Sequence, residues 1–209
     1  MRVATDIGGT FTDLVCLEFD KNTGKPIGVK VAKSDTTPAN FEQGILNTIK
    51  KGTINLQEVD FFAHGTTVVI NALTEHKGAK TALITTKGFR DVLEIARCNR
   101  PDLFNFNFVK QAPFVPRHLR FEVDERMSYK GDVLRELDMK SLEQILKKCK
   151  KENVEAIAIC LLHAYKNPTH EIQLKKRLLE LNITVEVIAS HEVTREWREY
   201  ERTSSTVLS

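Results

Sequence analysis

The stretch that decides the fold is residues 6–13, DIGGTFTD, which joins two apolar segments close to the N-terminus. Residues 3–7 are β-branched and short, and residues 11–19 alternate with a period of two, so both segments predict strands. A turn signal at 22–24 and an apolar segment over 27–33 predict a third strand. The first three strands should therefore form an antiparallel meander.

The hydrophobic period changes after this meander. Phe41, Ile45 and Ile49 are spaced by four residues, which predicts a helix that ends at Gly52. We expect Thr37 to be its N-cap, with Pro38 at the first helical position. The elements expected next are a strand, a helix, a strand and a short helix, over residues 61–64, 68–77, 80–85 and 88–95.

This order, βββαβα followed by further α/β alternation, predicts the fold class. A simple doubly wound sheet would not begin with three meandering strands. The order is instead typical of the N-terminal half of an actin-like ATPase, which has a ribonuclease-H-like fold. The expected segments are a phosphate-loop subdomain, a Pro/Phe-rich insertion with a hairpin, a second α/β segment and the truncated start of a following region, over residues 1–97, 98–136, 137–192 and 193–209.

The insertion is the least regular part of the chain, because three of the six prolines fall within residues 99–116. The same segment carries Phe104, Phe106, Phe108 and Phe114. We expect these rings to pin a loop onto the core, in preference to forming a cage that stacks on a ligand.

Composition excludes several classes of protein. The chain has 209 residues, 41% of them hydrophobic, and a net charge of +3 with acidic and basic residues interleaved, which is no footprint for nucleic acid. Its longest apolar run, residues 156–162, is too short to span a membrane, and an acidic residue near the start argues against a secretory signal. Four cysteines without a C-x-x-C pair predict reduced thiols in a cytoplasmic protein.

The glycines of the DIGGTFTD stretch predict a phosphate-binding loop. Gly8 and Gly9 let the backbone approach a ligand where a Cβ would collide, and successive N–H groups in such a turn form an anion-binding nest. The hydroxyls of Thr10 and Thr12 can donate hydrogen bonds to phosphate oxygens. The alternative is a plain hairpin turn whose glycines were selected for positive φ.

Two aspartates flank the loop and are the candidate metal ligands. Asp6 ends its strand, and Asp13 follows the loop; magnesium prefers hard oxygen ligands of this kind and keeps most of its water. The sequence does not decide which of the two lies nearer the metal.

A second signal is His64-Gly65-Thr66-Thr67, where a predicted strand enters a helix. Free N–H groups at such a position suit an anion or a polarised carbonyl. His64 is a candidate acid/base near neutral pH, although a structural hydrogen bond is the commoner role for a lone histidine. Asn71 lies one helical turn after Thr67 and should face the same side. The candidate catalytic residues are Asp6, His64, Thr66 and Thr67.

The chain resembles the N-terminal part of the hydantoinase A/oxoprolinase family. The resemblance covers nearly all 209 residues and is carried by DIGGTFTDLV, HGTTVVINAL, KTALITTKGFRDVLEIAR, RPDLF, FVPRHLRFEVDER and SHEVTREWREYERTSSTVL. The family includes ATP-dependent N-methylhydantoinases, oxoprolinases and the ATP-handling subunits of acetone and acetophenone carboxylases. Arg97 and Arg100 match basic positions of the family. Each could either form a salt bridge or clamp a phosphate.

The resemblance implies that ATP and Mg²⁺ activate an inert carbonyl, either in the hydrolysis of a cyclic amide or in the carboxylation of a ketone. The family's phosphate loop maps onto Asp6, Gly8, Gly9, Thr10, Thr12 and Asp13. The implied partners are a small-molecule carbonyl substrate and a second subunit of the hydantoinase B type. Family chains are several times longer, so we expect this fragment alone neither to bind ATP tightly nor to turn over.

Two other functions compete with this one. The chain could be a non-catalytic assembly module that docks a partner subunit through its Phe-rich loop and through Trp197 and Tyr200. A sugar or acetate kinase would fit the fold and the phosphate loop but not the HGTT segment.

Overall fold

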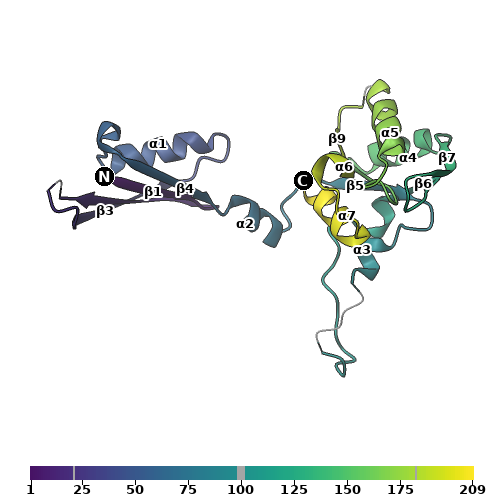
Figure 1. Ribbon diagram of the computed structural model, residues 1–209, viewed down its shortest axis with the longest axis horizontal. Coiled ribbons are helices and arrows are strands. Elements are labelled where there is room, and N and C mark those ends of the chain that lie inside the picture. Colours follow the sequence, from purple (N-terminus) through teal and green to yellow (C-terminus); the bar gives the residue numbers. More distant parts are fainter. Residues whose placement is uncertain (21, 98–101, 182) are drawn as a thin grey trace. The chain divides into compact units, whose positions relative to one another are not determined.

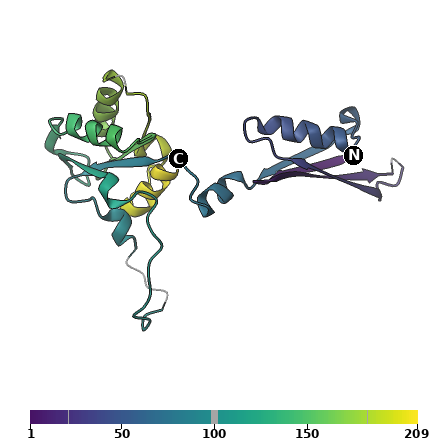
Figure 2. The same ribbon diagram turned by 180° about the vertical axis from the view of Figure 1, so that it is seen from behind.

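A computed structural model of the chain describes residues 1–20, 22–97, 102–181 and 183–209 (Figures 1 and 2). It contains two compact units, unit 1 over Met1–Gly78 and unit 2 over Ala79–Ser209. The boundaries predicted from sequence at 97, 136 and 192 stay predictions. No helix in the described ranges combines the length and the apolar character that crossing a bilayer requires.

Unit 1 is a four-stranded sheet with the order β3-β2-β1-β4. Its elements are β1 (Arg2–Ile7), β2 (Phe11–Phe19), β3 (Pro26–Asp35), α1 (Phe41–Lys51), the 3₁₀ turn η1 (Leu56–Glu58), β4 (Phe61–Thr66) and α2 (Val68–Thr74). Strands β1, β2 and β3 pair antiparallel, and β4 pairs parallel to β1. The predicted α/β class and βββαβα order are therefore confirmed, and β1 lies in the sheet between β2 and β4.

Helix α1 covers one face of this sheet, as Figure 1 shows. Alternate residues of β1 and β2 point toward it, and Val3, Leu14 and Cys16 form a small core with Ile49 and Ile54. Burying one side chain in two is what the period of a strand produces.

The predicted start of α1 is wrong. The N-cap is Asn40, whose side chain accepts a hydrogen bond from the N–H of Gln43. Thr37 and Pro38 precede the helix, and the Thr37 hydroxyl donates to the carbonyl of Asn40. Asparagine is among the strongest N-caps, and here it displaces a threonine three residues earlier. Gly52 ends the helix as predicted.

The other face of the unit 1 sheet is apolar and exposed. Val15 pairs with Val31 and Leu17 pairs with Val29 across β2 and β3, and all four side chains are exposed. Within the described residues of unit 1, no helix covers this face.

Unit 2 is a five-stranded sheet with the order β7-β6-β5-β8-β9. Its elements are β5 (Thr81–Thr86), α3 (Val92–Ile95), the 3₁₀ turn η2 (Arg117–Leu119), β6 (Arg120–Met127), β7 (Val133–Asp138), α4 (Leu142–Lys151), β8 (Ala156–Cys160), α5 (Thr169–Glu180), β9 (Glu186–Ala189), α6 (Ser190–Val193) and α7 (Glu199–Leu208). Strands β6, β5, β8 and β9 are parallel, and only β7 is antiparallel to its neighbour.

Helices cover both faces of the unit 2 sheet. Figures 1 and 2 show α4 and α5 on one face and α3 and α7 on the other. A single large core runs through this unit, and the interior strand β8 is buried almost throughout, as its uninterrupted apolar sequence predicts.

The Phe-rich segment differs from the prediction. Phe104 is 85% and Phe106 is 88% exposed, so these two rings do not pin the loop onto the core. The loop that carries them projects away from the sheet of unit 2 (Figures 1 and 2).

Candidate functional site

The turn between β1 and β2 is held in one shape by backbone hydrogen bonds. The N–H of Gly8 donates to the carbonyl of Phe11 at 2.9 Å and closes the turn. Thr36, just after β3, donates its N–H to the carbonyl of Thr10 and its hydroxyl to the carbonyl of Gly8, both at 2.9 Å. The bond that closes the turn does not use the N–H groups of Gly9 and Thr10, which form the exposed tip.

Gly8 and Gly9 lie in different surroundings, so a side chain at each position would have a different effect. Neither has a positive φ, so the positive-φ explanation of the Gly-Gly pair is wrong. A Cβ on Gly8 would lie 3.0 Å from the carbonyl oxygen of Phe11, which is tighter than most real Cβ contacts, so the neighbouring atoms would have to shift by a few tenths of an ångström. A Cβ on Gly9 would meet only the Asn71 side chain, at 3.4 Å. A side chain at position 8 would crowd the hairpin, whereas the space over Gly9 is open to a ligand.

Two carboxylates lie side by side next to this turn. Asp6 and Asp13 are direct partners in the β1–β2 register, and both are exposed on the face away from α1. Gly65 of β4 is the neighbour of Asp6 on the other side, and a Cβ there would lie 3.6 Å from Asp6 Oδ1. Lys33 places its Nζ 3.3 Å from Asp13 Oδ1 and 4.7 Å from the centre of the Phe11 ring.

This pair fits a magnesium ion that is shared with a phosphate ligand. Mg²⁺ is bound by one or two carboxylates together with water and substrate phosphates, and adjacent strands offer two such groups here. Elsewhere in the described ranges, as here, no three His, Cys, Asp or Glu side chains are grouped so as to hold a metal. Asp6 and Asp13 therefore suit a metal that brings its remaining oxygen ligands with it.

The two threonines of the loop are in opposite situations. Thr10 is exposed at the tip of the turn. Thr12 is fully buried on the α1 side, where its Oγ1 lies 3.3 Å from Thr36 Oγ1. The hydroxyl of Thr12 thus braces the turn from behind, and only that of Thr10 is accessible from solvent.

The HGTT segment is divided between the two faces of the sheet. His64 lies on the face that α1 packs against, with its Nδ1 3.0 Å from the hydroxyl of Thr5. Gly65 lies on the opposite face, beside Asp6. The structure therefore does not bring His64 together with the carboxylate pair, and its Thr5 contact is of the structural kind.

Thr66 and Thr67 fasten β4 and α2 to the end of β1. Both hydroxyls point to the carbonyl of Ile7, at 3.2 and 3.5 Å, and the N–H of Thr67 donates to the same oxygen at 3.0 Å. The Asn71 amide lies 3.5 Å from Thr67 Oγ1, on the predicted side. These contacts hold the HGTT segment directly against the glycine turn.

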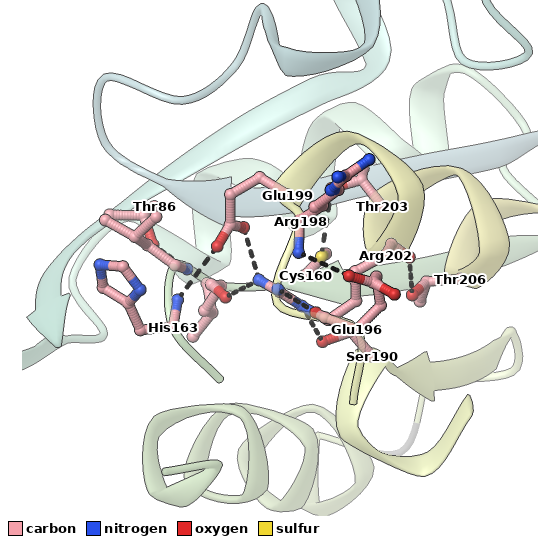
Figure 3. A network of polar contacts seen from close by, with 12 residues as sticks. Thr86, Cys160, His163, Ser190, Glu196, Arg198, Glu199, Arg202, Thr203 and Thr206 are labelled. Atoms are coloured by element: carbon pink, nitrogen blue, oxygen red, sulfur yellow. Dashed lines mark hydrogen bonds and ion pairs between the residues drawn. The ribbon is translucent and has the colours of Figure 1, made fainter. Parts of the chain in front are cut away.

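A buried polar network in unit 2 was not predicted from the sequence. Arg202 of α7 is fully buried and donates to the carbonyls of Leu161 and Glu196, at 2.9 and 2.8 Å, and to Ser190 Oγ at 3.2 Å (Figure 3). Its guanidinium also pairs with Glu199. Desolvation by burial raises the pKa of Glu199, against the opposing effect of Arg202.

Glu171 of α5 holds the other side of this network. Its carboxylate is fully buried and accepts four hydrogen bonds, from Leu161 N, Ser190 Oγ, His191 N and His191 Nδ1, at 2.7 to 3.1 Å. Ser190, His191 and Arg202 all fall within the SHEV…REYER string that carries the family resemblance, which was the available signal.

The network fills the place where open α/β sheets usually bind ligands. The strand order along the chain reverses between β5 and β8, and the crevice beyond the carboxyl ends of the strands at such a switch point is where open α/β sheets generally bind ligands. Here the hydroxyl of Thr86 accepts the Leu162 N–H at 2.8 Å, and His163 has a left-handed φ of 60°. Burial first, and then the charges of Arg202 and Arg126, lower the pKa of His163. Side chains of the protein itself thus occupy this crevice, and the network connects α5, α6 and α7 to the carboxyl ends of β5 and β8.

Arg97 is in a salt bridge. Its Nε lies 2.6 Å from Glu201 of α7, which satisfies the salt-bridge alternative. Arg100 lies outside the described residues.

Comparisons with known proteins agree with this architecture. The family model of the hydantoinase/oxoprolinase N-terminal region matches residues 2–182. A protein of Methanocaldococcus jannaschii is 41% identical over 100% of this chain and 30% of its own length. Caprolactamase subunit alpha of Pseudomonas jessenii is 30% identical over 100% of this chain and 30% of that subunit. The nucleotide-free structure of acetone carboxylase, an ATP-dependent enzyme, superposes with a TM-score of 0.80 at 25% identity, over 100% of this chain and 31% of that one. The chain thus spans about 30% of the length of these relatives.

Proposed function

Because this chain belongs to the hydantoinase/oxoprolinase family, we propose that it forms the N-terminal, phosphate-binding part of an ATP-dependent enzyme that activates a carbonyl. The reaction we favour is N-methylhydantoinase-like hydrolysis of a cyclic amide. The observation that carries the proposal is the pairing of Asp6 with Asp13 beside a turn whose tip, at Gly9, is open.

Each residue of this site has a task in the proposal. The N–H groups of Gly9 and Thr10 and the hydroxyl of Thr10 receive phosphate oxygens, while Asp6 and Asp13 hold Mg²⁺. Bound Mg-ATP would supply the phosphoryl group that makes an amide carbonyl reactive. The buried hydroxyl of Thr12 keeps the turn in place.

The HGTT segment is the proposed substrate side. Thr66 and Thr67 fix this segment against the turn, and His64 keeps its Nε2 available while Nδ1 contacts Thr5. In the proposal His64 moves a proton at the substrate, as an imidazole near neutral pH can. Its position on the α1 side of the sheet makes this role separable from metal binding.

The alternative substrate class is a ketone. In that case the chain is the ATP-handling part of an acetone- or acetophenone-type carboxylase, with bicarbonate as second substrate. One panel separates the two: ATP consumption by the full-length enzyme with caprolactam, hydantoin or 5-oxoproline, and with acetone or acetophenone plus bicarbonate. Stimulation by a ketone plus bicarbonate alone would replace the amide proposal.

A matched pair of variants tests the site itself. Asp6→Asn should lower ATP turnover of the full-length enzyme by roughly 100-fold or more, because the metal loses a charged ligand. Glu18→Gln removes a carboxylate on the same hairpin, near its other end, where Glu18 pairs with Lys30 at 2.7 Å, and should leave turnover unchanged. Equal activity of the two variants contradicts the proposal.

The fragment by itself should be inactive. In actin-like ATPases the second phosphate loop and the adenosine pocket come from later in the chain, so one turn lacks the enclosure that phosphoryl transfer needs. Isothermal titration of the 209-residue chain with Mg-ATP should show no micromolar binding.

A second role is favoured by the exposed Phe-rich segment. Leu103, Phe104, Phe106 and Val109 are between 69% and 88% exposed and close together in sequence, which is typical of an interaction surface. We propose that this segment docks a second subunit of the hydantoinase B type in the cytoplasm. Phe104→Ser combined with Phe106→Ser should release that subunit in size-exclusion chromatography. The control Leu134→Ser, at a β7 position that is 67% exposed, should not.

A further inference from the structure

A cationic pocket lies wholly within unit 2, at the amino end of β6. It has a volume of about 520 Å³ and is lined by Arg90, Arg117, His118, Arg120, Phe121 and Lys148. These residues come from the loop before α3, from η2, from the start of β6 and from α4. No carboxylate is among the lining side chains.

Two guanidinium groups in this pocket have unused donors. Arg120 has a side chain only 1% exposed, with Nε donating to the carbonyl of Val115 at 2.9 Å and Nη2 donating to Glu94 at 3.0 Å. Its Nη1 is buried without a hydrogen-bond partner among the described residues, although it lies 3.8 Å from Asp91 Oδ1, and the Nε of Arg90 is buried without a hydrogen-bond partner as well. Buried donors without partners are rare, which suggests that a ligand completes them.

The charges of the pocket do not cancel. Arg117 makes two hydrogen bonds to Asp91, at 2.9 and 3.1 Å, and these lower the pKa of the Asp91 carboxyl, so that pair is neutral as a whole. Arg120 is likewise balanced by Glu94. Arg90 and Lys148 have no salt bridge within the part of the chain that the structure describes.

Two further carboxylates lie near the pocket without lining it: Glu122, whose charge acts on Arg117, and Glu152. Glu152 lies 3.9 Å from His118, but it also pairs at 3.2 Å with Lys80, which is outside the lining. Of the four permanent cations in the lining, Arg117 and Arg120 are in salt bridges with carboxylates, and Arg90 and Lys148 are in none among the described residues. The lining therefore keeps an excess of positive charge, which suits an anion.

We propose that this pocket binds a phosphate group, either as inorganic phosphate or as the phosphate of a small organic monoester. Guanidinium forks and an ammonium that approach from different elements suit a tetrahedral oxyanion, and planar Arg groups bind phosphate oxygens in pairs. Phe121 adds an apolar wall, and the volume exceeds what one phosphate ion needs, so the organic part of a monoester has room beside it.

The test uses two adjacent lysines of α4. Lys148 lines the pocket and Lys147 does not, yet both are exposed and carry the same charge. Isothermal titration of the full-length enzyme with sodium phosphate at low ionic strength should show saturable binding. Lys148→Gln should weaken that binding about fivefold, the loss expected for one unit charge about 4 Å away when water fully screens the interaction. Lys147→Gln should leave it within about twofold.

Further arms identify the source of the phosphate and guard against misfolding. Tighter binding of glycerol 3-phosphate than of inorganic phosphate would indicate a monoester, and the reverse would indicate the free ion; either outcome supports the pocket. Arg90→Gln should reproduce the Lys148→Gln effect with an unchanged melting temperature. The proposal is overturned if phosphate does not bind saturably, if sodium acetate binds equally well, or if the two lysine variants lose the same affinity.

Discussion

The two glycines of the β1–β2 turn make opposite predictions, and comparing them separates folding from ligand binding. The change is Gly8→Ala in one variant and Gly9→Ala in the other. A Cβ on Gly8 would lie 3.0 Å from the Phe11 carbonyl oxygen, which is fixed because it accepts the Gly8 N–H. Either the hydrogen bond or the hairpin must shift, and overpacking of this kind costs about 1–3 kcal/mol.

Gly9→Ala should hardly affect folding. Its new methyl group meets only the Asn71 side chain, at 3.4 Å, and φ at Gly9 is not positive. The expected change in the free energy of unfolding is within about 0.5 kcal/mol. Its effect falls on the ligand: a methyl group over the turn displaces a phosphate oxygen and removes a charge-assisted hydrogen bond, worth about 1.5–3 kcal/mol or at least tenfold in nucleotide affinity.

The assay measures both quantities on the full-length enzyme. Hydrogen exchange over β1 and β2 reports the stability of the hairpin, and titration with a non-hydrolysable ATP analogue and Mg²⁺ reports affinity. Gly8→Ala should speed exchange, whereas Gly9→Ala should leave exchange unchanged and weaken nucleotide binding. The reasoning is refuted if Gly9→Ala destabilises the hairpin as much as Gly8→Ala, or if it binds the nucleotide like the unmodified enzyme.

Three other predictions concern the buried Glu171, two buried cysteines and the exposed His64. Glu171→Gln should destabilise unit 2 by about 3–5 kcal/mol in chemical unfolding, because four donors lose a buried charge, whereas Glu180→Gln, on the surface of the same helix, should change stability by less than about 1 kcal/mol. Burial raises the pKa of the Cys149 and Cys160 thiols from 9.0 to about 11, so between these values the folded chain keeps protons that the unfolded chain releases. These thiols should therefore contribute their full stability below pH 9 and lose it between pH 9 and 11. The urea midpoint should fall over this range, and a constant midpoint would contradict the burial of the two thiols. His64→Gln should reduce substrate-dependent ATP turnover without changing the affinity for Mg-ATP, because His64 faces away from Asp6; a parallel loss of nucleotide affinity would place both on one site.

Local patterns predicted the parts of the fold that local patterns determine. The period-two segments give β1 and β2 with their bounds nearly unchanged, and the four-residue spacing gives α1. The start of α1 was missed because Asn40 and Thr37 are both good caps, and only the geometry of the chain entering the helix selects one.

The site was predicted in composition but not in arrangement. The residue types of the glycine turn were sufficient to select Asp6 and Asp13 as candidate metal ligands, and the structure places the two on one face. Side chains alternate between the two faces of a strand, so His64 and Gly65 lie on opposite faces of the sheet. Treating HGTT as one motif overlooks this alternation. The network around Arg202 depends on contacts between residues that are far apart in the sequence, such as Arg202 and Leu161 at 41 positions, so no local pattern could reveal it.

The central claim is that the turn at Gly8 and Gly9 receives the terminal phosphates of a nucleotide. The most direct measurement is a crystal structure of the full-length enzyme with Mg²⁺ and a non-hydrolysable ATP analogue. The account predicts phosphate oxygens within hydrogen-bond distance of the Gly9 and Thr10 N–H groups, with the metal adjacent to Asp6 or Asp13. Phosphates bound elsewhere, with this turn facing solvent or covered by protein side chains, would contradict it.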